Sequence, residues 1–275
     1  MKTDAGTLTI RIVSYVAIIL ASVVCLTPAI WLIAAAFKGP DDLFHYTFFA
    51  PKLTLINFAD LFTTIPFGRC LINSTFIAST TVVVQLFFSS LAGFGVAKYD
   101  FKGKKLVIVI MLATMMIPGQ VLMAPMYELI SRLGFVDSYT GLIIPGAVSV
   151  FGIFLFRQSI LQIPDELIQA ARIDGGSEFR IYWSVVMPIS RPMIGAFCLI
   201  SFMGTWNSFL WPQIILQTSE RFTLPIALNQ LVGLYSNQYG TLMAGTVLSI
   251  LPVILIFLIL QKEFVAGLTA GAVKG

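Results

Sequence analysis

The residues whose types and spacing could do chemistry lie in one polar segment, residues 163–188, between two long apolar runs. Six of its side chains are ionisable: Asp165, Glu166, Arg172, Asp174, Glu178 and Arg180. Six charges cannot sit in hydrocarbon, so this segment is expected to lie outside a lipid bilayer with structure of its own. The chemistry that such residues suggest is polar contact with another protein.

The local pattern predicts two short helices within this segment. Pro164 and Asp165 mark the start of the first helix, with Asp165 as its N-cap and Glu166 favoured by the helix dipole. An apolar stripe is expected at Leu167, Ile168, Ala170 and Ala171. Gly175 should end the helix after Asp174, because glycine readily adopts the left-handed conformation of a helix C-terminus.

Ser177 is predicted to cap the second helix. The apolar residues of this second helix would be Phe179, Tyr182, Val185 and Val186.

The first helix has two possible roles, docking into a groove of another protein or lying on the membrane surface. A membrane-surface helix favours Lys and Arg on its polar face. Residues 163–188 mix acids with bases, so protein docking is the favoured interpretation.

Other kinds of chemistry find little support in the sequence. Cys25, Cys70 and Cys198 show no C-x-x-C spacing, and buried apolar thiols are expected rather than a disulfide framework or a metal site. His45 has no second metal ligand nearby. The sequence also has no phosphate-binding G-x-x-x-x-G-K-[ST] motif. No cofactor is therefore expected on this chain.

The elements that position this segment are long and apolar. Of the 275 residues, 57% are hydrophobic and 11% are charged, whereas a soluble domain carries about 25% charged residues. A surface of this composition suits lipid. Six spanning helices are predicted, at about residues 12–37, 72–97, 106–123, 139–156, 193–210 and 242–260. The fold class is therefore an all-α membrane protein, with one transmembrane domain over residues 1–275.

The distribution of basic residues predicts an orientation for these six spans. With both termini in the cytoplasm, 12 of the 17 Lys and Arg residues lie in inside segments and five lie in outside segments. Cytoplasmic loops of membrane proteins carry such an excess of basic residues. The net charge of +4 is explained in this way, and no nucleic-acid partner is expected.

The predicted spans hold almost no ionisable side chain, and their polar residues are neutral. Gln85 is expected to make hydrogen bonds between helices. For Asn73, such a hydrogen bond and a place along a solute path are both possible interpretations. Asn207, beside Trp206, has two interpretations that remain open. Asn207 could make such a hydrogen bond, or Asn207 and Trp206 could line a wet, neutral path suited to hydroxyl-rich solutes.

Several stretches resemble the permeases of ABC importers. Gln169-Ala170-Ala171-Arg172-Ile173-Asp174-Gly175 is similar to their "EAA" loop, whose pattern is roughly Glu-Ala-Ala-x-x-Asp-Gly-Ala. Residues 205–212 (TWNSFLWP) and residues 261–275 (QKEFVAGLTAGAVKG) are similar to signatures of the carbohydrate uptake branch, which includes the smaller permease of the maltose system. The resemblance covers nearly the whole chain.

This resemblance implies a type I importer permease fold in the bacterial cytoplasmic (inner) membrane. The chain would form a translocation path as a heterodimer with a sister permease. Two ATPase subunits would bind ATP and Mg²⁺, and an extracytoplasmic binding protein would deliver the substrate. The chain itself would not be an enzyme. A disaccharide or oligosaccharide, or a related polyol or glycerol phosphate, would be carried inward.

The resemblance also assigns a role to residues 163–188, which would be the coupling loop seated in a cleft of one ATPase. The residues expected to make that contact are Glu166, Gln169, Ala170, Ala171, Asp174 and Gly175. Gln169 stands where the family pattern has Glu, and a neutral amide gives a weaker hydrogen bond than a carboxylate. Glu166 lies one helical turn earlier and is the hypothetical source of that charge.

Two further segments receive expectations from the resemblance. Residues 212–240 would face the binding protein, and their side chains suited to sugar hydroxyls are Asn229, Gln230, Tyr235, Asn237 and Gln238. Residues 267–275 would lie near the ATPase. A solvated loop and a frayed end are the respective alternatives.

Two other classes of membrane protein fit the sequence less well. An ion-coupled carrier would place acids within its spans and show an internal repeat, and neither is found. A channel or a membrane scaffold would leave the charged loop and its signature unexplained.

Overall fold

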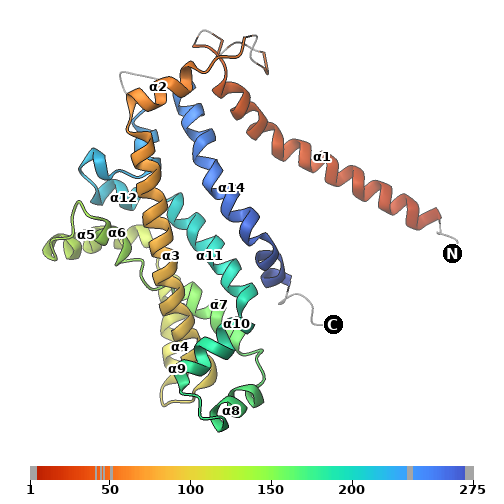
Figure 1. The fold of residues 1–275 in the computed structure, drawn as a ribbon, viewed down its shortest axis with the longest axis vertical. Coiled ribbons are helices and arrows are strands. Elements are labelled where there is room, and N and C mark those ends of the chain that lie inside the picture. Colours follow the sequence, from red (N-terminus) through yellow and green to blue (C-terminus); the bar gives the residue numbers. More distant parts are fainter. Residues whose placement is uncertain are drawn as a thin grey trace. The chain divides into compact units, whose positions relative to one another are not determined.

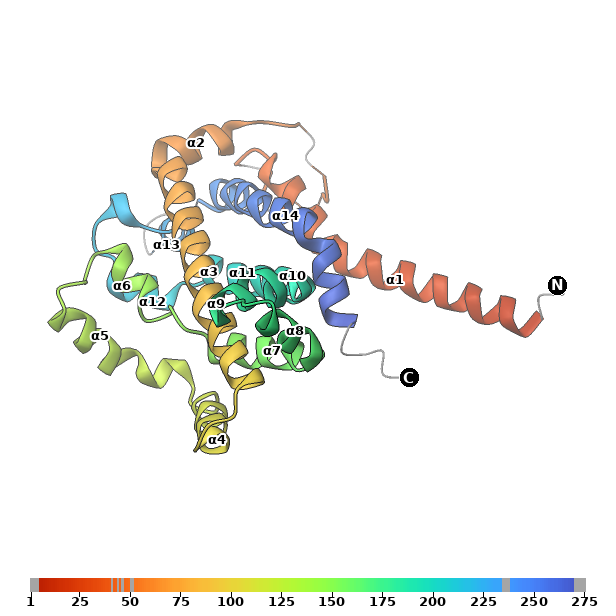
Figure 2. The same ribbon diagram turned by 60° about the horizontal axis from the view of Figure 1, so that its bottom comes forward.

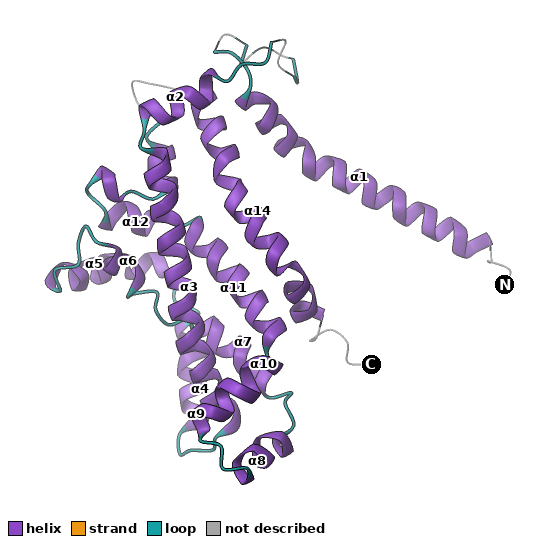
Figure 3. Cartoon of the chain, viewed as in Figure 1, coloured by secondary structure: helices purple, strands orange, loops and turns teal. Residues whose placement is uncertain are grey.

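A computed structural model describes residues 5–40, 42–43, 45, 47–49, 52–233 and 238–269. These residues form helices joined by short links (Figure 3). The chain divides into two compact units. The first comprises Met1–Phe67 and Leu228–Ile250, and the second comprises Gly68–Ala227 and Leu251–Gly275.

The first unit contains α1 (Ala5–Ala36), α2 (Ile56–Thr64) and the first part of α14 (Tyr239–Thr269). The side-chain amide of Asn57 holds the link after α1 by donating to the carbonyl oxygens of Ala36 and Lys38, at 2.9 and 2.7 Å. Most of the large apolar side chains along α1 are exposed, as expected for a helix that meets lipid or another chain.

The second unit contains the remaining helices. In chain order these are α3 (Phe67–Lys98), α4 (Lys104–Thr114), η1 (Gly119–Leu122), α5 (Met123–Arg132), α6 (Tyr139–Ile143), α7 (Val150–Ile160), α8 (Asp165–Ile173), α9 (Glu178–Ile181), η2 (Tyr182–Val186), α10 (Met187–Ile189), α11 (Arg191–Trp206), α12 (Leu210–Ile215), η3 (Ser219–Arg221) and α13 (Leu224–Asn229), which ends in the first unit. α3 runs along the unit, with α12 beside one end and α7, α9 and α10 towards the other (Figure 1).

Three of the predicted spans are continuous helices. Thr9–Ala36, Phe67–Lys98 and Tyr239–Gly267 are each long and apolar enough to cross a membrane. If each bent pair of helices forms one span, the structure has two further spans. The helices Lys104–Thr114 and Gly119–Arg132 meet at 91°, and Glu178–Ile189 and Arg191–Trp206 meet at 82°. The number of six spans and the orientation stay predictions.

The predicted continuous helix over residues 139–156 is wrong. α6 ends at Ile143, and α7 begins at Val150. Pro145 lies in the break, and proline has no N–H group with which to continue a helical hydrogen-bond ladder. Ser149 then starts α7 anew, because its side-chain oxygen accepts the N–H of Gly152 at 3.0 Å.

Two apolar clusters hold the second unit together. One lies where α3, α7, η2 and α11 meet and includes Phe94, Phe156, Tyr182 and Phe197. The other joins α3 to α5, α6 and α12 and includes Ile77, Ile130, Leu142 and Ile215. Gly152 makes the first cluster possible, since a Cβ there would lie 2.6 Å from the ring of Phe197.

Candidate functional site

The predicted docking helix exists and lies at one end of the second unit. α8 is the helix at the lower end of this unit in Figure 1, and Figure 2 brings it forward. Ile168 is its one buried residue and packs in the cluster of Phe156 and Tyr182. Apart from Ile168 and the half-buried Ala171, the residues of α8 are exposed.

Most of the residues predicted to contact an ATPase are exposed. Glu166, Gln169, Ala170, Asp174 and Gly175 are exposed, and Ala171 is half-buried. The predicted apolar stripe is therefore only partly correct. Leu167 is 47% exposed, whereas Ile168 and the half-buried Ala171 pack against the core.

The predicted capping of α8 requires one correction. Pro164 is the N-cap residue, and its side chain makes no cap hydrogen bond. Asp165 is instead the first helical residue, and its carboxylate accepts a hydrogen bond from Lys98 Nζ at 2.6 Å. A nearby cation competes well for a carboxylate, because charge-assisted hydrogen bonds are stronger than neutral ones.

The other predicted end signals are confirmed. Gly175 follows α8 with φ of +81°, the left-handed conformation that favours glycine. Ser177 accepts the N–H of Arg180 at 3.3 Å and starts α9. The sequence Asp-Gly-Gly-Ser therefore makes the turn between the two helices, as its residue types indicate.

A cluster at the end of α3 fixes the position of this turn. Lys98 Nζ also donates to the carbonyl oxygen of Ile163 at 2.5 Å. The next residue, Tyr99, donates its hydroxyl to Glu178, and Glu178 pairs with Arg172 Nε at 2.7 Å. Arg172 and Tyr99 hold the pKa of the Glu178 carboxyl below its usual value. We call Lys98, Tyr99, Arg172 and Glu178, together with Asp165, the α3 clamp.

Sequence reasoning missed one prominent residue of α8. Ile173 is 87% exposed although it is a large apolar side chain. It lies four residues after Gln169 and seven after Glu166, so the three share one face of the helix. The signal in the sequence was an apolar residue directly before Asp174 and Gly175, which end the helix.

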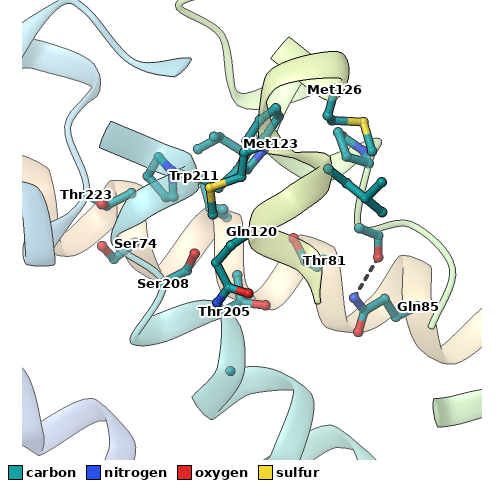
Figure 4. Close-up of a pocket in the computed structure, with 18 residues that line it drawn as sticks. Ser74, Thr81, Gln85, Gln120, Met123, Met126, Thr205, Ser208, Trp211 and Thr223 are labelled. Atoms are coloured by element: carbon teal, nitrogen blue, oxygen red, sulfur yellow. Dashed lines mark hydrogen bonds between the residues drawn. The ribbon is translucent and has the colours of Figure 1, made fainter. Parts of the chain in front are cut away.

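A second candidate site is a cavity of about 460 Å³ in the same unit (Figure 4). Its lining residues come from α3, η1 and α5, from α6 and the α6–α7 link, from α11, α12 and the link between them, and from the link before α13. None of these 18 residues is charged. The polar ones are Ser74, Thr81, Gln85, Gln120, Thr205, Ser208, Trp211 and Thr223. Non-helical backbone is tolerated at membrane depth where it lines such a cavity.

Some polar groups of the cavity wall hold helices together. Gln85 donates its side-chain amide to the carbonyl oxygen of Gly146 at 2.6 Å, and it accepts the hydroxyl of Ser201 at 2.5 Å. This confirms the predicted hydrogen bonds between helices for Gln85. Next to the wall, the side-chain amide of Asn73 also joins two segments, because it donates to the carbonyl oxygens of Glu220 and Phe222.

Other polar groups of the wall are not used in this way. Among the described residues, none forms a side-chain hydrogen bond with Gln120, Thr205 or Ser208. Figure 4 shows these three side chains converging on the same space. The buried hydroxyls of Thr81 and Thr223 also lack a partner in the described chain. These polar side chains of the wall are therefore available for hydrogen bonds to a ligand.

The two residues predicted for a pathway do not line this cavity. Trp206 is buried and stacks on Phe202, with ring centroids 5.4 Å apart. Asn207 is exposed, and its side-chain amide donates to the carbonyl oxygen of Met203 at 2.9 Å. Their neighbours Thr205 and Ser208 are the ones that reach the cavity. A pathway role for Trp206 and Asn207 stays a prediction.

A polar latch ties the α5–α6 link to the α12–η3 link. Asp137 has φ of 53°, and its carboxylate accepts the N–H groups of Gln217 and Thr218 at 2.9 and 3.1 Å. Arg221 pairs with the same carboxylate at 2.8 Å. The Thr218 hydroxyl, the Gln217 N–H and Arg221 lower the pKa of Asp137 to about 2.

Parts of two predicted contact segments fall outside the described residues. These parts are Tyr235 and Asn237 of the outer segment, and residues 270–275 of the tail. Asn229 ends α13. The described start of the tail packs closely, because a Cβ at Gly267 would lie 2.7 Å from the carbonyl oxygen of Pro192.

Comparisons with known proteins agree on the kind of protein. The chain is 46% identical over 203 residues to the arabinooligosaccharides transport system permease protein AraQ of Bacillus subtilis, covering 74% of this chain and 72% of that protein. It is 33% identical to the lactose transport system permease protein LacG of Rhizobium radiobacter, covering 96% of each. It is 36% identical to the sn-glycerol-3-phosphate transport system permease protein UgpE of Pectobacterium atrosepticum, covering 74% of each.

A solved structure confirms the predicted all-helical permease fold. A chain of a bacterial ABC transporter involved in the import of the acidic polysaccharide alginate superposes with a TM-score of 0.85. The match covers 96% of this chain and 99% of that one, at 23% identity. Residues 85–269 match the family described as the binding-protein-dependent transport system inner membrane component. With its several apolar helices, the chain is a multi-pass membrane protein that belongs to this family.

Proposed function

We propose that this chain is a permease subunit of an ATP-driven bacterial importer of sugars, located in the cytoplasmic membrane. The single observation that carries this proposal is α8. Its EAA-type residues are exposed, while the α3 clamp ties it to a helix that lines a neutral cavity. A helix presented to water at one end and joined rigidly to a cavity wall suits the transmission of movement from a partner to a pathway.

The partners of this chain are a sister permease, two ATPase subunits and an extracytoplasmic binding protein. The ATPases hold ATP and Mg²⁺, because this chain has no phosphate-binding loop. α8 docks in a cleft of one ATPase through Glu166, Ala170 and Asp174, with Ile173 as an apolar anchor on the same side. Closure of the ATPases moves α8, and nucleotide binding thereby biases the transporter between two states.

The substrate is a disaccharide or an oligosaccharide. Relatives of this chain are named for arabinooligosaccharides and lactose, which are neutral sugars, and for glycerol 3-phosphate, which is an anion. A neutral substrate agrees with the absence of charged side chains among the residues that line the cavity. An anion would require a basic partner on another subunit.

Co-purification tests the docking of α8. The chain is expressed with its partner subunits, extracted in mild detergent and examined for ATPase that elutes with it. We expect the ATPase to co-elute, and we expect scrambling of residues 170–175 to release it. Lys102→Ala, an exposed change in another loop, serves as the control. A chain that binds no ATPase and transports alone under an ion gradient would contradict the proposed function.

Single substitutions test which residue replaces the family glutamate. Glu166→Ala should reduce the ATPase activity that the loaded binding protein stimulates, because the carboxylate makes the stronger, charge-assisted contact. Gln169→Ala should be nearly silent in the same assay. The opposite order of effects would assign the contact to Gln169 and exclude Glu166.

A further inference from the structure

The neutral cavity of the second unit combines apolar walls with unused hydrogen-bonding groups. Its volume of about 460 Å³ falls within the roughly 300–1,000 Å³ of small-molecule sites. Such sites are mostly apolar and carry a few polar groups that orient the ligand. Met123 and Trp211 supply apolar surface here, and Gln120, Thr205 and Ser208 supply the polar groups (Figure 4).

The polar groups of the wall divide into two sets. Gln85 and Trp211 are occupied by the fold, since Trp211 Nε1 donates to the carbonyl oxygen of Gly141 at 3.2 Å. Gln120, Thr205 and Ser208 make no side-chain hydrogen bond to another described residue. An amide and two hydroxyls offer both donors and acceptors. Sugar hydroxyls need this mixture, whereas a phosphate needs donors and positive charge.

The free groups lie where two helices are interrupted. Gln120 belongs to η1, directly after the 91° bend of the α4–α5 pair. Thr205 and Ser208 flank the end of α11. In secondary transporters, discontinuous helices commonly form the substrate sites, because their ends place polar groups at membrane depth, and the same physical reason applies here. Helix breaks and unused side chains therefore coincide at one place.

We infer that this cavity is a binding subsite for one unit of a neutral, hydroxyl-rich sugar, contributed by this chain itself. Gln120, Thr205 and Ser208 bind the hydroxyls, and Trp211 packs against the apolar face of the sugar ring. An anion is disfavoured there, because it would lose its hydration without meeting a positive charge. This inference rests on the proposed function and adds to it a site and a substrate class.

Cysteine protection in the assembled complex tests this subsite directly. Ser208→Cys is made in a background whose native cysteines are replaced by alanine and which still imports arabinotriose. The rate of labelling by a small uncharged maleimide is measured with and without arabinotriose. We expect arabinotriose to slow labelling at least fivefold. The control Thr75→Cys, at an exposed position of α3, should be labelled at the same rate in both conditions.

The outcomes separate this subsite from the proposed function. Unchanged labelling at position 208, when the parent complex with Ser208 intact imports arabinotriose, would overturn the subsite and leave the importer intact. A parent complex that imports no sugar would overturn the proposed function itself. Glycerol 3-phosphate, the anionic probe, should give no protection. Equal protection by this anion would overturn the preference for neutral solutes.

A second pair of variants tests the hydroxyl of Thr205. Thr205→Val keeps the shape of the side chain and removes its hydroxyl. It should raise KM for arabinotriose about five- to tenfold, the loss of one hydrogen bond. Thr205→Ser should restore uptake, and Thr75→Val should have no effect, since its hydroxyl only donates to the carbonyl oxygen of Leu71. An unchanged KM in Thr205→Val would contradict a sugar contact there.

Discussion

At the residue scale, side chains of similar type have different tasks that only their partners reveal. Gln85 and Gln120 both line the cavity, but Gln85 is held by Gly146 and Ser201, whereas no other residue in the described part of the chain forms a hydrogen bond with the Gln120 side chain. Among the acids, Asp165 binds Lys98, whereas Glu166 is exposed one residue further on. Residue type thus indicates which hydrogen bonds or ion pairs a side chain can form. The neighbouring residues decide whether those bonds are made within the protein.

The Asp137 latch gives a prediction at this scale. Asp137→Asn keeps a residue that tolerates positive φ but removes the charge that Arg221 and the N–H groups of Gln217 and Thr218 stabilise. We expect a loss of about 1–2 kcal/mol in the free energy of unfolding, allowing for solvent screening. Thermal unfolding of the purified complex at pH 7 measures this loss.

The pH dependence of this effect follows from the pKa of Asp137. The folded protein lowers this pKa to about 2, so the stabilisation is complete above the ordinary aspartate pKa and is lost as pH falls through about 2. The gap between wild type and Asp137→Asn should therefore stay constant from pH 7 to about pH 5 and narrow below pH 4. Glu128→Gln, in an exposed pair with Arg132, is the control. A gap that does not depend on pH would refute this account.

At the scale of elements, α3 connects the two candidate sites. Its first half carries Ser74 and Thr81 into the cavity wall, and its last residue, Lys98, holds the start of α8. Gly152 lets α7 pack closely against Ser89 of α3, since a Cβ atom on Gly152 would lie only 2.9 Å from the Cβ of Ser89. A rigid helix with contacts at both ends can transmit a displacement of α8 to the cavity.

The α3 clamp gives the prediction at this scale. Lys98→Met removes the ammonium group that binds Asp165 and the carbonyl of Ile163, but keeps an unbranched, apolar stem. We expect binding of the ATPase to persist while sugar uptake per ATP hydrolysed falls roughly two- to tenfold, because coupling networks carry about 0.5–2 kcal/mol. Uptake and ATPase activity are measured in the same proteoliposomes.

The control for the clamp is a basic residue with an exposed pair elsewhere. Arg132 pairs with Glu128 across a turn of α5, at 2.5 Å, and exposed pairs contribute little. Arg132→Met should leave the ratio of uptake to hydrolysis unchanged. An unchanged ratio in Lys98→Met would show that α8 moves the pathway without this contact.

At the scale of the whole molecule, the distribution of basic residues predicts the orientation in the membrane. The excess of basic residues predicts that α8 faces the cytoplasm and that the latch at Asp137 faces outward. Ser177→Cys should therefore react with an impermeant thiol reagent only in inside-out vesicles. Glu220→Cys, exposed in η3, should react only in right-side-out vesicles. The reverse pattern would invert the topology and exclude docking of a cytoplasmic ATPase on α8.

The sequence alone was enough to predict the membrane class, the charged loop and its two helices. These properties have local causes. Long apolar runs require lipid. Gly175 ends one helix and Ser177 caps the next, and each affects only the adjacent helical turn. The interhelical role of Gln85 was also predictable, because a lone amide in an apolar span needs a partner. Each of these features follows from a short stretch of chain.

Tertiary structure decided the rest, because it brings distant residues together. The pairing of Lys98 with Asp165 joins residues 67 positions apart and overrides the local preference of Asp165 for capping. Trp206 and Asn207 were the residues that drew attention in the sequence, but the end of α11 turns Thr205 and Ser208 towards the cavity instead. The cavity itself is formed by breaks in several helices, and no single segment encodes it. Sequence thus determined which chemistry is present, and packing decided where it can be used.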